Sequence, residues 1–213
     1  MALVKLFAGG IRPLPPGNEP TGIFKQACAA PVWLGREGLA NDAQADRRVH
    51  GGPAKALHQY PAVHYAALAQ AFPAAAAALV PGSLGENLSV DGWDEDSVAV
   101  GDVFRLGDAV IQVTQPRSPC WKIDRRFGVE GMTRFVDAGG LTGWYYRVLE
   151  EGEVAPGCRF ERIERPAPDA AVRRIFELRK GPRGDRAELE AFAATPGLSP
   201  SWAEKLLARA RGG

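Results

Sequence analysis

The segment Gln115–Lys122 holds the residues of this chain best suited to chemistry. It reads Gln-Pro-Arg-Ser-Pro-Cys-Trp-Lys and places Cys120 behind two prolines, between Arg117 and Lys122. Proline fixes its own φ and biases the preceding residue towards extended backbone, so we expect a stiff loop. A sulfur held near two cations favours the thiolate, which is both a nucleophile and a metal ligand. Taken alone, a free cysteine is more often a small buried hydrophobe.

A second loop, Val49–Ala56, supplies further polar groups. It places His50 before Gly51 and Gly52, and Lys55 shortly after them. Paired glycines allow positive φ and the close approach of another group, and the exposed N–H groups of such a turn can bind an anion. Each of these features alone is most often an ordinary turn, so the interpretation depends on their combination.

In this order the motifs resemble the MOSC domain, the family related to the C-terminal part of molybdenum cofactor sulfurase, and in particular its stand-alone bacterial branch of the YiiM type. The resemblance extends over essentially the whole chain. It rests on the segments Thr21–Lys25, Gly38–Asp46, His50–Pro53, Gly85–Leu88, Gly101–Asp102 and Gln115–Cys120. The family usually has glycine where this chain has Asn41. Because Asn is the commonest non-glycine residue at positive φ, we expect the turn to be kept.

The resemblance implies a molybdenum cofactor, molybdopterin, with Cys120 as the molybdenum ligand. His50 is the other implied catalytic residue, either as a hydrogen-bond partner of an oxo or hydroxyl group or as a proton donor near neutral pH. The cofactor, with its phosphate, is expected to bind cations, backbone N–H groups and side-chain amides of the motifs: Lys25, Gly51, Gly52, Lys55, Asn87, Gln115 and Arg117. Four acidic residues either orient these groups or cap turns: Asp42, Asp46, Glu86 and Asp102.

The implied reaction is the two-electron reduction of an N-hydroxylated compound, such as 6-hydroxylaminopurine, to the amine and water. The sequence shows no flavin motif, dinucleotide fingerprint or iron–sulfur cysteine set, so electrons are expected from a separate flavoprotein reductase. Two other classes of function stay open. One is a non-catalytic carrier of the cofactor or of sulfur, and the other is a metal-free hydrolase or transferase that uses Cys120 and His50. Descriptions of the family also mention pyridoxal phosphate, although no lysine stands out as its Schiff base.

The composition is that of an ordinary globular protein. Hydrophobic residues make up 46% of the 213 residues and the formal net charge is +1, which argues against nucleic acid or an anionic membrane as a partner. No apolar run approaches the roughly 20 residues needed to span a bilayer. The N-terminal residues make a poor signal peptide, and the three cysteines are widely spaced. We therefore expect a cytoplasmic protein with reduced thiols.

The elements that must position these loops are predicted to be mainly strands. Short apolar segments recur between Gly, Pro and Asp residues: Leu3–Ala8, Gly22–Gln26, Val32–Leu34, Ala56–Tyr60, Val103–Leu106, Ala109–Thr114, Trp144–Leu149 and Arg159–Ile163. This spacing predicts a mainly β, β-barrel-like domain over residues 1–165. Helices are predicted after Pro61, over Ala74–Ala78 and at Ile123–Phe127.

From residue 166 the apolar spacing becomes helical. Asp169, Asp185 and Ser199 each precede such a stretch, and each is a residue type that caps helix N-termini. We therefore predict a small three-helix domain over residues 166–213, like the 3-alpha domain that follows MOSC in the YiiM-type branch.

Overall fold

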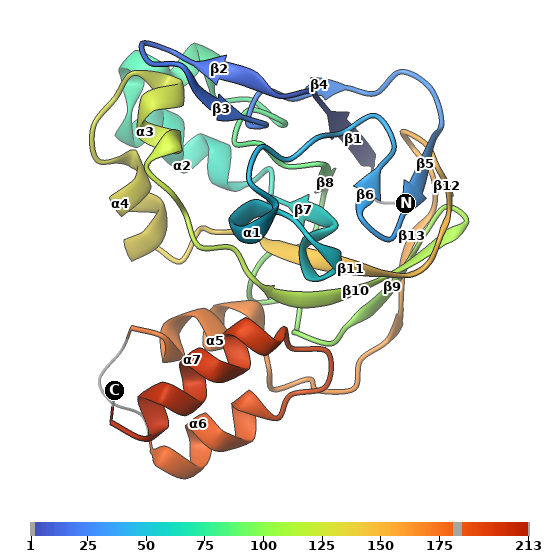
Figure 1. Ribbon diagram of the computed structural model, residues 1–213, viewed down its shortest axis with the longest axis vertical. Helices are drawn as coiled ribbons and strands as arrows, with labels where there is room; N and C mark the ends of the chain where they lie inside the picture. The colour runs from blue at the N-terminus through green and yellow to red at the C-terminus, as the bar shows by residue number, and fades with distance from the viewer. Residues whose placement is uncertain (1–2, 181–184, 213) are drawn as a thin grey trace.

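A large mixed sheet organises the molecule (Figure 1), whose computed structural model describes residues 3–180 and 185–212. In spatial order its eight strands are β13 (Phe160–Glu164), β9 (Val103–Leu106), β10 (Ala109–Pro116), β11 (Trp144–Glu150), β7 (Leu57–Gln59), β8 (Leu88–Val90), β1 (Val4–Ala8) and β4 (Gln26–Ala27). Neighbours are antiparallel except β7 and β8. The mainly β class is confirmed, and the sheet is open, ending at β13 and β4, rather than a closed barrel.

Two small sheets complete the β structure. One contains β12 (Gly152–Val154), β5 (Val32–Gly35) and β6 (Gly38–Leu39), and the other is the hairpin of β2 (Arg12–Leu14) and β3 (Glu19–Thr21). The prediction of a strand over Gly22–Gln26 is wrong for its first four residues. A Cβ atom on Gly22 would lie 2.3 Å from the Ala43 carbonyl oxygen, so the backbone packs here against another loop instead of pairing with a strand.

Six helical segments lie between β6 and β11 in the sequence: α1 (Arg47–His50), η1 (Pro53–Lys55), α2 (His64–Ala71), η2 (Pro73–Ala78), α3 (Lys122–Phe127) and α4 (Met132–Ala138). The three predicted helices are found, but α2 begins at His64 because Pro61 closes a turn, with its carbonyl accepting from His64 N at 3.2 Å. The alanine run forms a 3-10 helix. Elements α2, η2, α3 and α4 enclose a second apolar cluster that includes Tyr65, Leu68, Ile123 and Val136.

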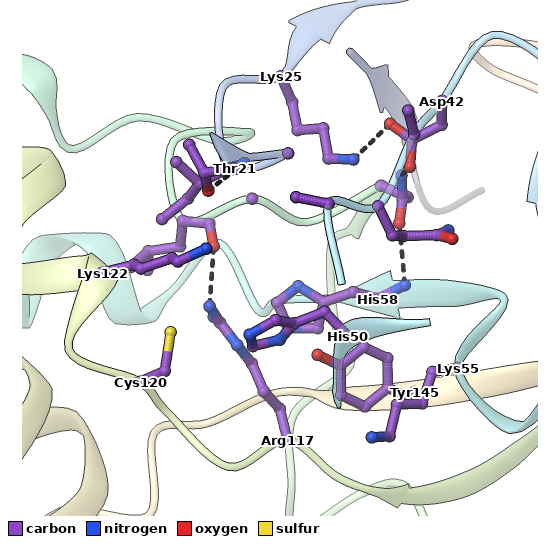
Figure 2. A pocket seen from close by; sticks show the side chains of 18 residues that line it. Thr21, Lys25, Asp42, His50, Lys55, His58, Arg117, Cys120, Lys122 and Tyr145 are labelled. Atoms are coloured by element: carbon purple, nitrogen blue, oxygen red, sulfur yellow. Dashed lines mark hydrogen bonds and ion pairs between the residues drawn. The ribbon is translucent and has the colours of Figure 1, made fainter. Parts of the chain in front are cut away.

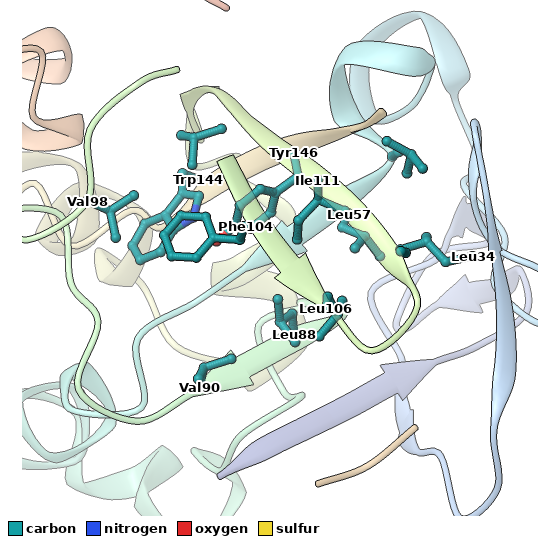
Figure 3. Packing of buried hydrophobic residues seen from close by; sticks show 14 of the residues in the cluster. Leu34, Leu57, Leu88, Val90, Val98, Phe104, Leu106, Ile111, Trp144 and Tyr146 are labelled. Atoms are coloured by element: carbon teal, nitrogen blue, oxygen red, sulfur yellow. The ribbon is translucent and has the colours of Figure 1, made fainter. Parts of the chain in front are cut away.

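The main core is built on the sheet, where Phe104 of β9, Ile111 of β10, and Trp144 and Tyr146 of β11 pack together (Figure 3). The C-terminal helices α5 (Val172–Leu178), α6 (Arg186–Ala193) and α7 (Pro200–Ala210) lie beside β10 (Figure 1). Buried residues of α5 and α7, including Trp202, belong to the same apolar cluster as the sheet. The division into two domains at residue 165 stays a prediction.

Two of the three predicted helix caps in this region are confirmed. Asp185 accepts from Ala187 N at 3.1 Å, and Ser199 Oγ accepts from Trp202 N at 3.4 Å. The prediction for Asp169 is wrong, because α5 starts two residues later and its cap is Ala171, which has no polar side chain. Within the described part of the chain, no helix is long and apolar enough to cross a membrane.

Candidate functional site

One pocket gathers the polar loops (Figure 2). It is a hollow that is partly open to solvent. Its walls come from the segment between β3 and β4, the segment after β6, the α1–η1 turn, β7, the loop before β8, the loop after β10, and β11. Residues far apart in the sequence therefore line a single pocket.

The loop that carries Cys120 is tied to its surroundings by hydrogen bonds. At its start, Arg117 N donates to the Gly143 carbonyl at 3.0 Å. At its end, the Cys120 carbonyl accepts from Ile123 N at 3.0 Å and from Thr133 Oγ1 at 3.1 Å. Lys122 Nζ donates to the Pro20 carbonyl at 2.8 Å, which links the loop to the β2–β3 hairpin. The expectation of a firmly held loop that presents a free, part-buried thiol agrees with these contacts.

Gly143 is required for this arrangement. Its φ is +66°, and a Cβ atom there would lie 2.2 Å from the Gln59 carbonyl oxygen. Its N–H donates to the buried Glu95 carboxylate at 2.7 Å, while its carbonyl receives Arg117 N. A side chain at this position would displace β7 from β11 and, with it, the start of the Cys120 loop.

Arg117 is the most unusual cation of the pocket. It is 8% exposed, and its Nη2 donates to the Leu84 carbonyl at 3.1 Å. Its Nη1 atom is buried without a hydrogen-bond partner, and over residues 3–180 and 185–212 no carboxylate lies within ion-pairing distance of the guanidinium. Since burial of an unpaired charge is costly, the pocket is suited to receive an anion at this point.

Lys25 lies on the opposite wall and has a carboxylate partner. It is ion-paired with Asp42, and the two side chains are 5% and 2% exposed. Asp42 also accepts from Gly9 N at 2.8 Å and from Asn87 Nδ2 at 2.9 Å. The second Asn87 Nδ2 hydrogen is donated to the Phe7 carbonyl at 3.2 Å. Asn87 therefore has no free donor for a ligand, and its amide positions Asp42 and Lys25.

Two histidines line the pocket. Burial, followed by the charges of Arg117, Lys122 and Lys55, lowers the pKa of His50 to about 4. Its ring is therefore neutral near pH 7, which favours a role as hydrogen-bond partner over the cationic proton donor considered from the sequence. Burial above all, with Arg117 nearby, also holds the pKa of His58 well below its usual value.

The last wall is formed by Lys55 and Tyr145. Lys55 Nζ donates to the Val49 carbonyl at 2.5 Å and lies 6.0 Å from the Tyr145 ring centroid. Burial, with the charge of Lys205 on α7 adding to it, lowers the pKa of Lys55. Burial raises the pKa of Tyr145, so its hydroxyl stays protonated and can donate to a ligand.

The structure brings most of the sequence-predicted site residues together. Six line the pocket: Lys25, His50, Lys55, Asn87, Arg117 and Cys120. Gly51, Gly52 and Gln115 do not. A Cβ atom on Gly51 would meet Gln44 and Arg47, so the glycines let the α1–η1 turn close on itself rather than face the hollow. Gln115 is buried beside Tyr145 in the β10–β11 ladder, with its Oε1 unpaired.

His58 and Tyr145 line the pocket but were not predicted as site residues. They lie in Ala56–Tyr60 and Trp144–Leu149, two segments predicted as strands, and the structure pairs them in β7 and β11. The sequence could have predicted this for His58, because side chains alternate along a strand and His58 therefore lies on the opposite face from the buried Leu57.

The turn at Asn41 is kept, as expected, with Asp42 N donating to the Leu39 carbonyl at 3.0 Å. It forms without positive φ at Asn41, since no non-glycine residue of the described chain has positive φ.

Comparisons with known proteins agree with the fold and the motifs. Residues 46–161 match the MOSC domain. YflK of Bacillus subtilis (strain 168) is 41% identical over 85% of this chain and 81% of its own length. Protein YiiM of Escherichia coli (strain K12) is 36% identical over 97% of this chain and 91% of its own. The crystal structure of that YiiM superposes with a TM-score of 0.84, covering 100% of this chain and 94% of its own at 30% identity.

A longer protein also shares this segment. A protein of Gibberella moniliformis (strain M3125 / FGSC 7600), named "Reductase", is 34% identical to this chain over 172 residues. The match covers 80% of this chain but 30% of that protein.

Proposed function

The chain belongs to the MOSC domain family, which is associated with the molybdenum cofactor, and we propose that it is an oxidoreductase dependent on that cofactor. The proposed reaction is the reduction of N-hydroxylated compounds, such as 6-hydroxylaminopurine, to the amine. One observation carries the proposal. Cys120, the cysteine of the family-like motif, lines the same pocket as a buried arginine that has no carboxylate partner.

The residues present suit a phosphate-bearing pterin. The free Nη1 of Arg117 offers a donor at a buried point, and a guanidinium can hold a phosphate through two parallel hydrogen bonds. Lys55 and Lys122 line the same pocket and add positive charge. In the proposed holoprotein these three cations hold the phosphate, and the Cys120 thiolate binds the molybdenum, for which sulfur is a suitable ligand.

When bound, the cofactor supplies a two-electron reduction that converts the hydroxylamino group to the amine with release of water. The chain's own groups orient the substrate. His50, neutral near pH 7, can exchange a hydrogen bond with the N–OH group through a ring nitrogen. Lys25 Nζ, held by Asp42, presents fixed N–H donors on the facing wall. Leu84 and Tyr145 line the same pocket and add apolar surface to it.

Electrons are proposed to come from a separate flavoprotein reductase. The Gibberella moniliformis protein named "Reductase" supports this, because 70% of its length lies outside the segment that resembles this chain.

The test uses a cell that lacks its own reductases of this type and is exposed to 6-hydroxylaminopurine. The wild-type gene is expected to restore resistance, and the Cys120→Ala gene to fail. Cys28→Ala and Cys158→Ala are matched controls, because neither cysteine lines the pocket. Failure of the wild type, in cells where the protein still carries molybdenum and pterin, would replace the enzyme by the non-catalytic carrier.

A further inference from the structure

Two adjacent tyrosines of β11 face different surroundings. Tyr146 belongs to the apolar core, and its hydroxyl donates to Gln59 Oε1 at 2.7 Å. Tyr145 lines the pocket instead, because side chains alternate along a strand. Over residues 3–180 and 185–212, its hydroxyl has no partner at normal hydrogen-bond geometry, and Oη is not among the unpartnered atoms that are shut off from solvent. The Tyr145 hydroxyl is therefore available to a group in the hollow.

The position of this hydroxyl is fixed by the packing of its ring. The His58 ring lies against it, with centroids 5.2 Å apart and planes at 41°, and Lys55 Nζ lies 6.0 Å from its centroid. The hydroxyl points away from Lys55, toward the side of the pocket where Arg117 and Cys120 lie (Figure 2). Burial above all raises the pKa of Tyr145, while the charge of Arg117 lowers it and that of Cys120 raises it. The hydroxyl thus stays protonated near neutral pH, on the side of the proposed metal ligand.

The reduction of an N–OH group consumes two protons, and the pocket has few groups that could supply them. His50 and His58 are neutral near pH 7, because burial lowers the pKa of both. An arginine does not lose its proton in proteins. Each lysine that lines the pocket already donates to an acceptor of the protein: Lys25, Lys55 and Lys122. Of the residue types that usually transfer protons in enzymes, this leaves the Tyr145 hydroxyl beside the proposed metal ligand.

We propose that Tyr145 is a catalytic residue that donates its hydroxyl hydrogen to the oxygen of the substrate's N–OH group. It thereby selects N-hydroxylated compounds over the corresponding amines, and it supplies one of the two protons that the reduction consumes. This inference rests on the proposed function, in which the molybdenum cofactor is the source of the two electrons.

In the proposed step, two electrons enter R–NHOH and the N–O bond breaks. The oxygen keeps its own hydrogen, takes the hydroxyl hydrogen of Tyr145 and leaves as water, while the nitrogen takes the second proton from solvent and becomes the amine. Transfer to a hydroxide-like oxygen is favourable, because a phenol is a stronger acid than water. The charge of Arg117 stabilises the tyrosinate that remains, which regains its proton from solvent.

The test compares Tyr145→Phe with Tyr146→Phe, which each remove one hydroxyl from neighbouring positions of β11. Oxidised holoprotein without an electron donor binds ligands without reducing them, so calorimetry measures its affinities for 6-hydroxylaminopurine and for adenine. We expect the wild type and Tyr146→Phe to bind 6-hydroxylaminopurine about tenfold more tightly than adenine, as for one hydrogen bond, and Tyr145→Phe to bind the two equally. With a reductant supplied, kcat of Tyr145→Phe should fall about 100-fold or more at unchanged molybdenum content.

Thermal stability provides the control. Tyr146→Phe should melt below the wild type, because Gln59 Oε1 loses its donor, whereas Tyr145→Phe should melt with the wild type. An undiminished preference for 6-hydroxylaminopurine in Tyr145→Phe, or a wild type without that preference, would overturn the proposal. An unchanged kcat in Tyr145→Phe would overturn the proton-donor role. A wild type whose preference depends on Tyr145 but which does not reduce 6-hydroxylaminopurine refutes the proposed function and leaves Tyr145 as a binding residue.

Discussion

Two regions of this molecule bury carboxylate or guanidinium groups, but only one of them provides every polar atom of those groups with a hydrogen-bond partner from the protein. Beneath α2, Glu86 accepts from Tyr65 Oη at 2.6 Å, from Gly82 N at 2.6 Å and from Leu84 N at 3.1 Å. Glu95 likewise contacts His64 Nε2 at 2.6 Å and accepts from Gly143 N at 2.7 Å. In the pocket, by contrast, Arg117 Nη1 is buried without a hydrogen-bond partner among the described residues.

This difference separates buried polar groups that hold the fold together from a buried polar group that is available to a ligand. Both carboxylates are fully buried, and their hydrogen bonds fix the loops behind the pocket, including the Gly143 turn that receives Arg117 N. The Arg117 Nη1 atom makes no hydrogen bond within the described part of the protein. Substitutions in the first region should therefore change folding, and substitutions in the second should change binding.

The largest effect on stability is expected for Glu86→Ala. The substitution leaves two buried donors, Tyr65 Oη and Gly82 N, without an acceptor, and it leaves Leu84 N with only the long contact to Tyr65 Oη at 3.4 Å. The free energy of unfolding should therefore fall by about 3 kcal/mol. Urea unfolding of the purified protein measures it. Glu188→Ala is the matched control, because that residue pairs with Arg174 at the surface and should change stability by less than about 1 kcal/mol. Equal losses of unfolding free energy in the two variants would show that the buried Glu86 carboxylate stabilises the fold no more than a surface ion pair does.

Arg117→Met should weaken cofactor binding strongly and change stability only a little. Retention of the pterin is expected to fall roughly 10- to 100-fold, since a hydrogen bond to a charged group contributes about 1.5–3 kcal/mol. The unfolding free energy of the cofactor-free protein should change by only about 1 kcal/mol, because the removed cation has no carboxylate partner. Arg173→Met, which removes a cation paired with Asp96 outside the pocket, serves as control and should retain the pterin. Normal pterin content in Arg117→Met would contradict the assignment of Arg117.

The buried imidazole of His58 should also make stability depend on pH. Its folded-state pKa lies below the unfolded value of about 6.5, so the unfolded chain takes up the proton first as the pH falls. The wild type is therefore expected to lose stability relative to His58→Phe as the pH falls below about 6.5. Urea unfolding of both proteins at pH 7.5 and pH 5 tests this. A pH-independent difference between them would show that His58 does not resist protonation.

Much of the fold could be predicted from local pattern. The apolar segments at Val103–Leu106, Ala109–Thr114 and Trp144–Leu149 became β9, β10 and β11, because alternation and turn residues determine strands directly. The failures came from long-range contacts. Gly22–Gln26 has strand-like composition, but its start packs against Ala43 instead of a strand partner. The alternating pattern likewise could not distinguish an open sheet from a closed barrel.

The candidate site was predictable where chemistry is concentrated in a motif. Cys120, Arg117, His50 and Lys55 were expected in loops and all line the pocket. Hydrogen bonds between side chains far apart in the sequence could not be predicted. Asn87 was expected to contact the cofactor, but both its amide hydrogens are donated within the protein, to Asp42 and Phe7.

The proposed function requires Cys120 as the ligand that retains molybdenum, and metal analysis tests this most directly. Wild-type protein and Cys120→Ala are purified from a host that makes the cofactor, with Cys158→Ala as control, and molybdenum and pterin are measured per chain. We expect near-stoichiometric molybdenum in the wild type and in Cys158→Ala. In Cys120→Ala, molybdenum should be absent or strongly reduced, because alanine provides no thiolate. Undiminished molybdenum in Cys120→Ala, or none in the wild type, would contradict the account.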